Sequence, residues 1–220
     1  MAIDVGVVTE GCVDAALAES FVEDAGLEVI SEPIVVRGWR EAVSHAISLA
    51  LQTKTSYIVF IDADEDPRQR LDHVLELMRE RLGRHVQNQP YRYALSVKVG
   101  KDNNLMIILW LDPENPSCGT VECLLEKLVQ EAYNCQVTKE PPRCNDCPAK
   151  MVKYQKTYGK LQILAILSAC AGLGTLASTS SQEHCGLPMK RIIRILGHIK
   201  QSSTYQEILN TIKEMTSIQT

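Results

Sequence analysis

The first half of the chain alternates short apolar runs with longer amphipathic segments, and this alternation restricts the possible folds more than any other feature. The apolar runs predict strands at 3–9, 27–36, 57–61, 93–99 and 105–111. Between them, apolar residues recur at helical spacing, which predicts helices at 13–25, 41–51, 67–82 and 120–133. Alternating strands and helices indicate an α/β fold, with a mainly parallel sheet flanked by helices.

Two details refine this prediction. Pro33 lies inside the second apolar run, so that run is expected to be an edge strand or an interrupted one. The last two runs are separated by a turn rich in Gly, Asp and Asn, which is typical of a hairpin.

The composition changes after residue 134. Residues 135–149 hold three cysteines and three prolines and few apolar side chains, which is typical of a linker. The patterns beyond it are helical only, at 151–173, 189–199 and 205–215. We therefore expect an α/β domain at 1–134, a Cys/Pro-rich linker at 135–149, and a basic helical C-terminal extension at 150–220.

Charge is divided unevenly along the chain. Residues 150–200 contain eight Lys and Arg against one Glu, a net charge of +7. The whole chain carries −4 and residues 201–220 carry −1, so residues 1–149 carry −10. Such asymmetry suggests a polyanionic partner, although basic side chains that solvate helix faces are an equally simple interpretation.

Acidic residues follow two of the predicted strands. Glu10 comes directly after the first strand, and Asp62 and Asp64 follow the strand at 57–61. In an open parallel sheet, ligand sites gather outside the carboxyl ends of strands. Carboxylates that meet there repel one another unless a cation neutralises them, and oxygen-rich clusters suit Mg²⁺ or Mn²⁺. The sequence therefore predicts a metal site, and removal of one acid, as in Asp64→Asn, is expected to stabilise the metal-free fold.

Helix capping is the alternative for these acids. Asp64, Glu65 and Asp66 precede Pro67, which suits the first turn of a helix. Carboxylates at a helix N-terminus interact favourably with the helix dipole.

The acidic motifs together resemble the signature of the Toprim superfamily, which is found in topoisomerases, bacterial primases, small nucleases and overcoming-lysogenization-defect nucleases. The motifs are Glu10-Gly11-Cys12-Val13-Asp14 after the first strand and Asp62-Ala63-Asp64 after the third. A compact, uncharacterised Toprim-like family is similar in three further features, namely Gly38, the stretch from Asp112 to Leu125, and the helices around Lys153 to Lys156 and at 188–199. The similarity covers residues 1–125 well and 150–200 loosely.

This resemblance implies a Toprim-like fold and a role for each acid. Glu10 takes the place of the acid that binds metal or shuttles a proton, and Asp62 and Asp64 take the place of the pair that holds Mg²⁺ or Mn²⁺. Asp14 matches the second acid of nuclease-type members. The implied function is metal-dependent phosphodiester chemistry on nucleic acid, most simply as a nuclease.

The chain departs from the superfamily's larger members. It lacks the companion domains of topoisomerases and any Walker-type loop. One alternative is a noncatalytic Toprim-like module that binds a nucleotide or a partner protein. Another is a structural subunit whose acids only cap helices.

Lysines in the basic extension are candidates for nucleic-acid contact. Lys153 and Lys156 belong to a series at helical spacing, and a DNA or RNA backbone is a natural partner for such a stripe. The solvated-face interpretation remains open for them. Aromatic residues make up only 5% of the chain, which disfavours an array of base-stacking platforms.

Cysteine spacing leaves a choice in the linker. Cys144 and Cys147 have zinc-knuckle spacing, and Cys135 is a possible third ligand. A structural zinc or a disulfide are the two alternatives there, and free thiols are the default expectation for the eight cysteines of the chain.

No apolar stretch approaches the roughly 20 residues that span a bilayer. The start of the chain has no basic segment and enters a strand directly, so we expect no signal peptide, no membrane partner and a cytoplasmic location.

Overall fold

A computed structural model describes residues 3–83, 86–100, 103–133 and 197–217. The chain divides into two compact units, one formed by Met1–Val121 with Ile208–Thr220 and the other by Glu122–Glu207. The C-terminal residues from Ile208, which the sequence analysis assigned to the helical extension, are thus grouped with the sheet.

The first unit is built on a sheet to which the described residues contribute seven strands. The strands are β1 (Asp4–Thr9), β2 (Glu28–Val29), β3 (Ile34–Val35), β4 (Ser56–Asp62), β5 (Asn88–Pro90), β6 (Ala94–Lys98) and β7 (Asn104–Trp110). Their order is β2-β1-β4-β7-β6-β5, and β3 also pairs with β1. All pairs are parallel except β7 with β6 and β6 with β5, so the predicted mainly parallel sheet and hairpin are confirmed.

The helices of the described residues are α1 (Cys12–Asp24), α2 (Trp39–Thr53), α3 (Pro67–Leu82), α4 (Val121–Tyr133) and α7 (Ser203–Ser217), preceded by the 3-10 helix η3 (Gly197–Gln201). They confirm the five helices predicted at 13–25, 41–51, 67–82, 120–133 and 205–215 to within a few residues. The helix expected at 151–173 and most of the one expected at 189–199 lie outside the described residues. The α/β fold class is therefore established.

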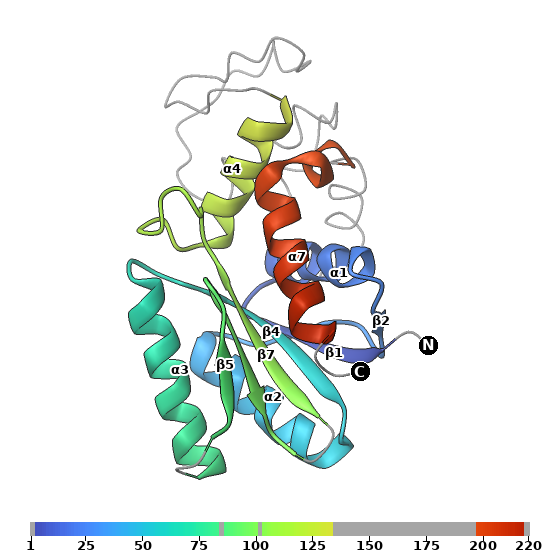
Figure 1. Ribbon diagram of the computed structural model, residues 1–220, viewed down its shortest axis with the longest axis vertical. Coiled ribbons are helices and arrows are strands. Elements are labelled where there is room, and N and C mark those ends of the chain that lie inside the picture. Colours follow the sequence, from blue (N-terminus) through green and yellow to red (C-terminus); the bar gives the residue numbers. More distant parts are fainter. Residues whose placement is uncertain (1–2, 84–85, 101–102, 134–196, 218–220) are drawn as a thin grey trace. The chain divides into compact units, whose positions relative to one another are not determined.

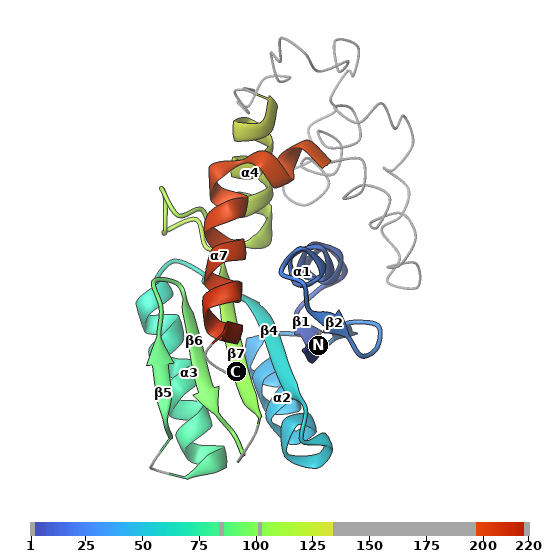
Figure 2. The same ribbon diagram turned by 45° about the vertical axis from the view of Figure 1, so that its right-hand side comes forward.

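Alternation along the strands sends side chains to two apolar layers. Val59 and Ile61 of β4 belong to a buried cluster with residues of α2 and α3. Phe60 points to the opposite face, where its ring stacks on Trp110 at 4.7 Å between centroids. Phe21 of α1 packs on the same Trp110 ring at 6.0 Å. Helices α2 and α3 therefore cover one face of the sheet and α1 covers the other, as the ribbon views allow the reader to follow (Figures 1 and 2).

The route of the chain places a switch point at β1. From β1 the chain passes through α1 to β2 and β3 on one side, and then through α2 to β4 on the other side. Because parallel crossovers are right-handed, two connections in opposite directions place their helices on opposite faces, and in open α/β sheets ligands bind outside the strand ends at such a point. Below, the crevice denotes the edge of the sheet at the carboxyl ends of β1 and β4, with the residues that follow them.

Two further expectations can be compared with the structure. Cys118 and Cys123 are both disulfide-bonded, so the free-thiol expectation is wrong for these two residues. Within the described ranges, no helix has the length and apolar character needed to cross a membrane.

Candidate functional site

Glu10 and Asp62 meet at the carboxyl ends of two adjacent parallel strands. Thr9 of β1 is paired in register with Phe60 of β4, so Glu10 follows β1 at the level where β4 ends. The Oε1 atom of Glu10 accepts a hydrogen bond of 2.9 Å from the backbone N–H of Asp62. This bond joins the Glu10 carboxylate, which follows β1, to the backbone at the end of β4.

Asp62 also holds the start of a helix. Its Oδ1 atom accepts a hydrogen bond of 3.0 Å from the backbone N–H of Val121, the first residue of α4. The first N–H groups of a helix have no partner within the helix, and a carboxylate there is favoured by the helix dipole. The capping interpretation therefore applies to one oxygen of Asp62.

Asp66 is the N-cap residue of α3. Its Oδ1 atom accepts hydrogen bonds from the backbone N–H groups of Arg68 and Gln69, at 2.9 and 3.1 Å, and Pro67 follows it in the first turn of α3. The acidic run therefore divides in role, because Asp66 caps α3 whereas Asp62 is bonded to Glu10.

Asp64 lies on a loop with an unusual backbone conformation. Its φ of 54° is in the left-handed region, which Asp adopts more readily than most residues. The Asp64 N–H donates to the carbonyl oxygen of Gly119 at 2.8 Å, which pairs the two chain segments. A Cβ at Gly119 would collide with the carbonyl oxygen of Asp64, so only glycine allows the segments to approach this closely.

An arginine that is not among the predicted site residues lies near these acids. Arg70 of α3 forms an ion pair with the Asp64 carboxylate through Nη2 and Oδ2. The Arg70 residue is only 8% exposed, whereas the Asp64 side chain is 64% exposed. Burial lowers the pKa of Arg70, and attraction to the carboxylates of Glu10 and Asp62 raises it in part. The guanidinium thus interacts electrostatically with all three acids of the predicted metal site.

The Trp39 ring also contacts this arginine. The Arg70 guanidinium carbon lies 4.7 Å from the centroid of the Trp39 ring, and the Arg40 guanidinium carbon lies 5.3 Å from it. The His73 ring stacks on Trp39 at 6.4 Å. Gly38, with φ of 81°, precedes Trp39 and allows the sharp turn by which α2 begins. The aromatic ring therefore holds the guanidinium in place through cation–π contact.

Asp14 lies in the first turn of α1 and is 2% exposed. This helix begins directly after β1, so Asp14 is placed at the same edge of the sheet as Glu10. Lys153 and Lys156 lie outside the described residues, as do Cys135, Cys144 and Cys147. Contact of the lysines with nucleic acid, and zinc or a disulfide at the cysteines, remain predictions.

The magnesium or manganese site expected at Glu10, Asp62 and Asp64 stays a prediction. Mg²⁺ binds oxygen ligands and is commonly held by one or two carboxylates together with water. Across residues 3–83, 86–100, 103–133 and 197–217, no group of three or more His, Cys, Asp or Glu side chains is arranged to hold a metal. Asp64 is paired with Arg70, and Glu10 is joined to Asp62 by the hydrogen bond from the Asp62 N–H.

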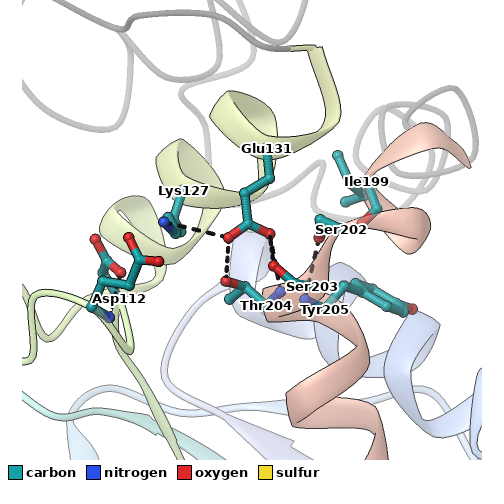
Figure 3. A network of polar contacts seen from close by, with 9 residues as sticks. Asp112, Lys127, Glu131, Ile199, Ser202, Ser203, Thr204 and Tyr205 are labelled. Atoms are coloured by element: carbon teal, nitrogen blue, oxygen red, sulfur yellow. Dashed lines mark hydrogen bonds and ion pairs between the residues drawn. The ribbon is translucent and has the colours of Figure 1, made fainter.

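The second unit contains a carboxylate with a structural role (Figure 3). Glu131 of α4 accepts hydrogen bonds from the Ser203 hydroxyl at 3.1 Å, the Thr204 N–H at 3.0 Å and the Thr204 hydroxyl at 2.8 Å. Its other contact is an ion pair with Lys127 at 3.4 Å. Burial raises the pKa of Glu131, but these donors outweigh burial and leave the pKa below its ordinary value. Glu131 is thus an N-terminal cap for α7.

A polar cavity of about 270 Å³ also lies in the first unit. It is lined by Gln87, Asn88, Gln89, Tyr91, Ser96, Lys98, Asn104 and Met215. Burial raises the pKa of Tyr91, and the negative charge of Glu214 raises it further. The cavity shares no lining residue with the acidic crevice.

The structure thus brings together Glu10, Asp62 and Asp64 at one edge of the sheet and adds Arg70 to them. The sequence carried a signal for Arg70, since residues 67, 70, 74, 77 and 78 are the buried positions of α3 and an arginine among them requires a partner.

Comparison with protein-family models, with curated proteins and with solved structures finds no match to this chain. Function is therefore inferred from the geometry and chemistry of the crevice.

Proposed function

We propose that the protein performs Mg²⁺- or Mn²⁺-dependent phosphodiester chemistry on nucleic acid, as a nuclease, at the crevice formed by Glu10 and Asp62. One observation carries the proposal, namely the hydrogen bond from the Asp62 N–H to Glu10, which joins two carboxylate residues at the switch point of the sheet. Ligands of open α/β sheets bind at such points. The resemblance to the Toprim superfamily suggests the same chemistry.

The residues of the crevice have separate tasks in this proposal. Glu10 and Asp62 would hold the metal ion, which would neutralise phosphate charge and activate a water molecule. Glu10 also receives a proton from the attacking water, and its orientation is fixed by the bond from Asp62. Asp14, in the first turn of α1, takes the role of the second acid of nuclease-type members. Lys153 and Lys156 bind the phosphate backbone of DNA or RNA.

A noncatalytic module that binds a nucleotide or a partner protein is the second candidate. The observation in its favour is that Asp62 caps α4 and Asp64 is paired with Arg70. Acids with such partners can serve the fold without a metal ion.

Cleavage of radiolabelled DNA and RNA oligonucleotides, single- and double-stranded, distinguishes the two candidates. We expect wild type to cleave at least one of them in Mg²⁺ or Mn²⁺, and Asp62→Asn to lose this activity. The asparagine oxygen can still accept the bond from Val121, so the loss is not explained by an uncapped helix. Asp66→Asn is the matched control, because it removes a nearby charge, keeps a good N-cap residue and should retain activity.

Metal-dependent binding of an oligonucleotide or nucleotide without cleavage would favour the noncatalytic module. Cleavage by Asp62→Asn at the wild-type rate would contradict the proposed site.

A further inference from the structure

We propose that Arg70 is the resident counter-cation of the acidic crevice and that it competes with a divalent cation for the carboxylates. This inference rests on the proposed function, and it identifies what controls the metal affinity of that same site. Its basis is the arrangement of four charged groups, Glu10, Asp62, Asp64 and Arg70, within one unit of the chain.

The burial of Arg70 requires an electrostatic explanation. A guanidinium removed from water is costly unless carboxylates and hydrogen bonds compensate for it. Arg70 is 8% exposed, and its Nε atom is buried and has no hydrogen-bond partner. The ion pair with Asp64 and the attraction to Glu10 and Asp62 therefore provide its compensation. An apolar residue at this position of α3 would avoid the cost, so the charge itself has a use.

The charges of the crevice match a divalent cation. With all groups ionised, three carboxylates and one guanidinium give a net charge of −2. A divalent cation would bring that charge to zero while Arg70 stays in place. Without Arg70 the same carboxylates would carry −3 and attract the cation more strongly. Arg70 therefore lowers the affinity of the crevice for metal while preventing repulsion among the acids in its absence.

The two partners of the ion pair differ in how readily they can move. Arg70 is buried and held against the Trp39 ring at 4.7 Å, whereas the Asp64 side chain is 64% exposed. Asp64 therefore exchanges Arg70 for a divalent cation by rotation of its side chain, while Arg70 stays in place. In the arrangement described above, Arg70 withholds Asp64 from the metal site.

The test is the affinity for Mn²⁺, measured by isothermal titration calorimetry on the full-length protein. A unit charge and a divalent ion about 6 Å apart in a medium as polar as water interact strongly enough to change affinity about tenfold. We therefore expect Arg70→Gln to bind Mn²⁺ at least about tenfold more tightly than wild type. Arg70→Lys, which keeps the positive charge, should remain within about threefold of wild type.

Arg40→Gln is the matched control. Arg40 also contacts the Trp39 ring, at 5.3 Å, but it is solvent-exposed and lies on α2. Its replacement removes the same charge from the same aromatic ring and should leave Mn²⁺ affinity unchanged. Circular dichroism establishes that each variant is folded before titration.

A second measurement follows the Arg70 side chain in the wild-type protein. The Nε–Hε resonance of Arg70 in a ¹⁵N-correlated NMR spectrum, assigned by its absence in Arg70→Lys, should shift during titration of wild type with Mg²⁺. The shift should have the same midpoint as the binding isotherm. A residue that serves packing alone would give no such shift, and that result would overturn the inference if Arg70→Gln does not fold.

The outcomes separate this inference from the proposed function. Equal Mn²⁺ affinity in wild type and folded Arg70→Gln, with loss of binding in Asp62→Asn, would overturn the competition and leave the metal site intact. Weaker binding by folded Arg70→Gln would also overturn it. Absence of binding in both wild type and Arg70→Gln would overturn the proposed function and the competition together.

Discussion

Replacing Asp64 with Asn is expected to destabilise the metal-free protein, which is the opposite of what the acidic cluster alone predicts. From the sequence, removal of one of several like charges should relieve repulsion. The structure adds Arg70, whose buried guanidinium is paired with Asp64. The sign of the effect therefore depends on which interaction of Asp64 is larger, repulsion by the other acids or attraction to Arg70.

The magnitude follows from the exposure of the two partners. Exposed ion pairs contribute about 0–1 kcal/mol, whereas removal of one partner of a fully buried pair costs about 3–5 kcal/mol. Arg70 is nearly buried but the Asp64 side chain is 64% exposed, so water screens the pair and the lower range applies. Asp64→Asn should lower the free energy of unfolding by about 1 kcal/mol. For a chain of this size, that corresponds to a fall in Tm of about 2–4 °C.

Thermal melts followed by circular dichroism in EDTA measure this change. Asp66→Asn is the appropriate control, because it removes a neighbouring acid that has no ion pair with Arg70 and keeps the cap of α3. Its Tm should stay within about 1 °C of wild type, since surface substitutions away from special features have small effects. A rise in Tm for Asp64→Asn would refute the reasoning, because it would mean that repulsion among the acids exceeds the attraction of Arg70.

Two further predictions concern the framework of the molecule. Glu131→Gln removes the charge that caps α7, and it should lower the free energy of unfolding of the second unit by about 1–2 kcal/mol at pH 7, measured by urea denaturation with a fluorescent or circular dichroism probe. Because the folded pKa of Glu131 is below its ordinary value, this stabilisation is present above the unfolded pKa of about 4.3 and is lost as the pH falls through the folded pKa, so wild type and variant should converge in acid. Gly119→Ala should force the Asp64 loop apart and cost about 1–3 kcal/mol, as judged by the same denaturation; a neutral result would mean that the loop moves without strain.

The regular elements were predictable because local patterns determine them. Residues 57–61 of β4 form a continuous apolar run bounded by Ser56 and Asp62, as expected of a strand buried on both faces. Pro33 correctly indicated an interruption, since β2 and β3 are two separate short strands that both pair with β1. Asp66 and Pro67 marked the start of α3 at the observed residue.

Features that depend on distant contacts were not predictable in the same way. Strand β5, Asn88–Pro90, is polar and exposed throughout, so no apolar alternation indicated it. The disulfide bonds of Cys118 and Cys123 depend on the fold and not on spacing. Asp62 caps a helix that begins 59 residues later, which no local capping motif can reveal.

Arg70 is the most informative of these cases. Its position on the apolar side of α3 was visible in the sequence, but its partner Asp64 depends on the left-handed turn after β4 and on the approach of Gly119. The acidic pattern therefore predicts a cluster that requires a cation, but it does not reveal that the chain supplies one cation itself.

The central claim is that Glu10 and Asp62 hold a divalent metal ion at the carboxyl ends of β1 and β4. Anomalous diffraction from a crystal soaked in Mn²⁺ tests this claim most directly, because it locates the ion without reference to activity. The account predicts an anomalous peak within coordination distance of the carboxylates of Glu10 and Asp62. A fully soaked crystal with no peak in this crevice, or with its strongest peak at other residues, would contradict the claim.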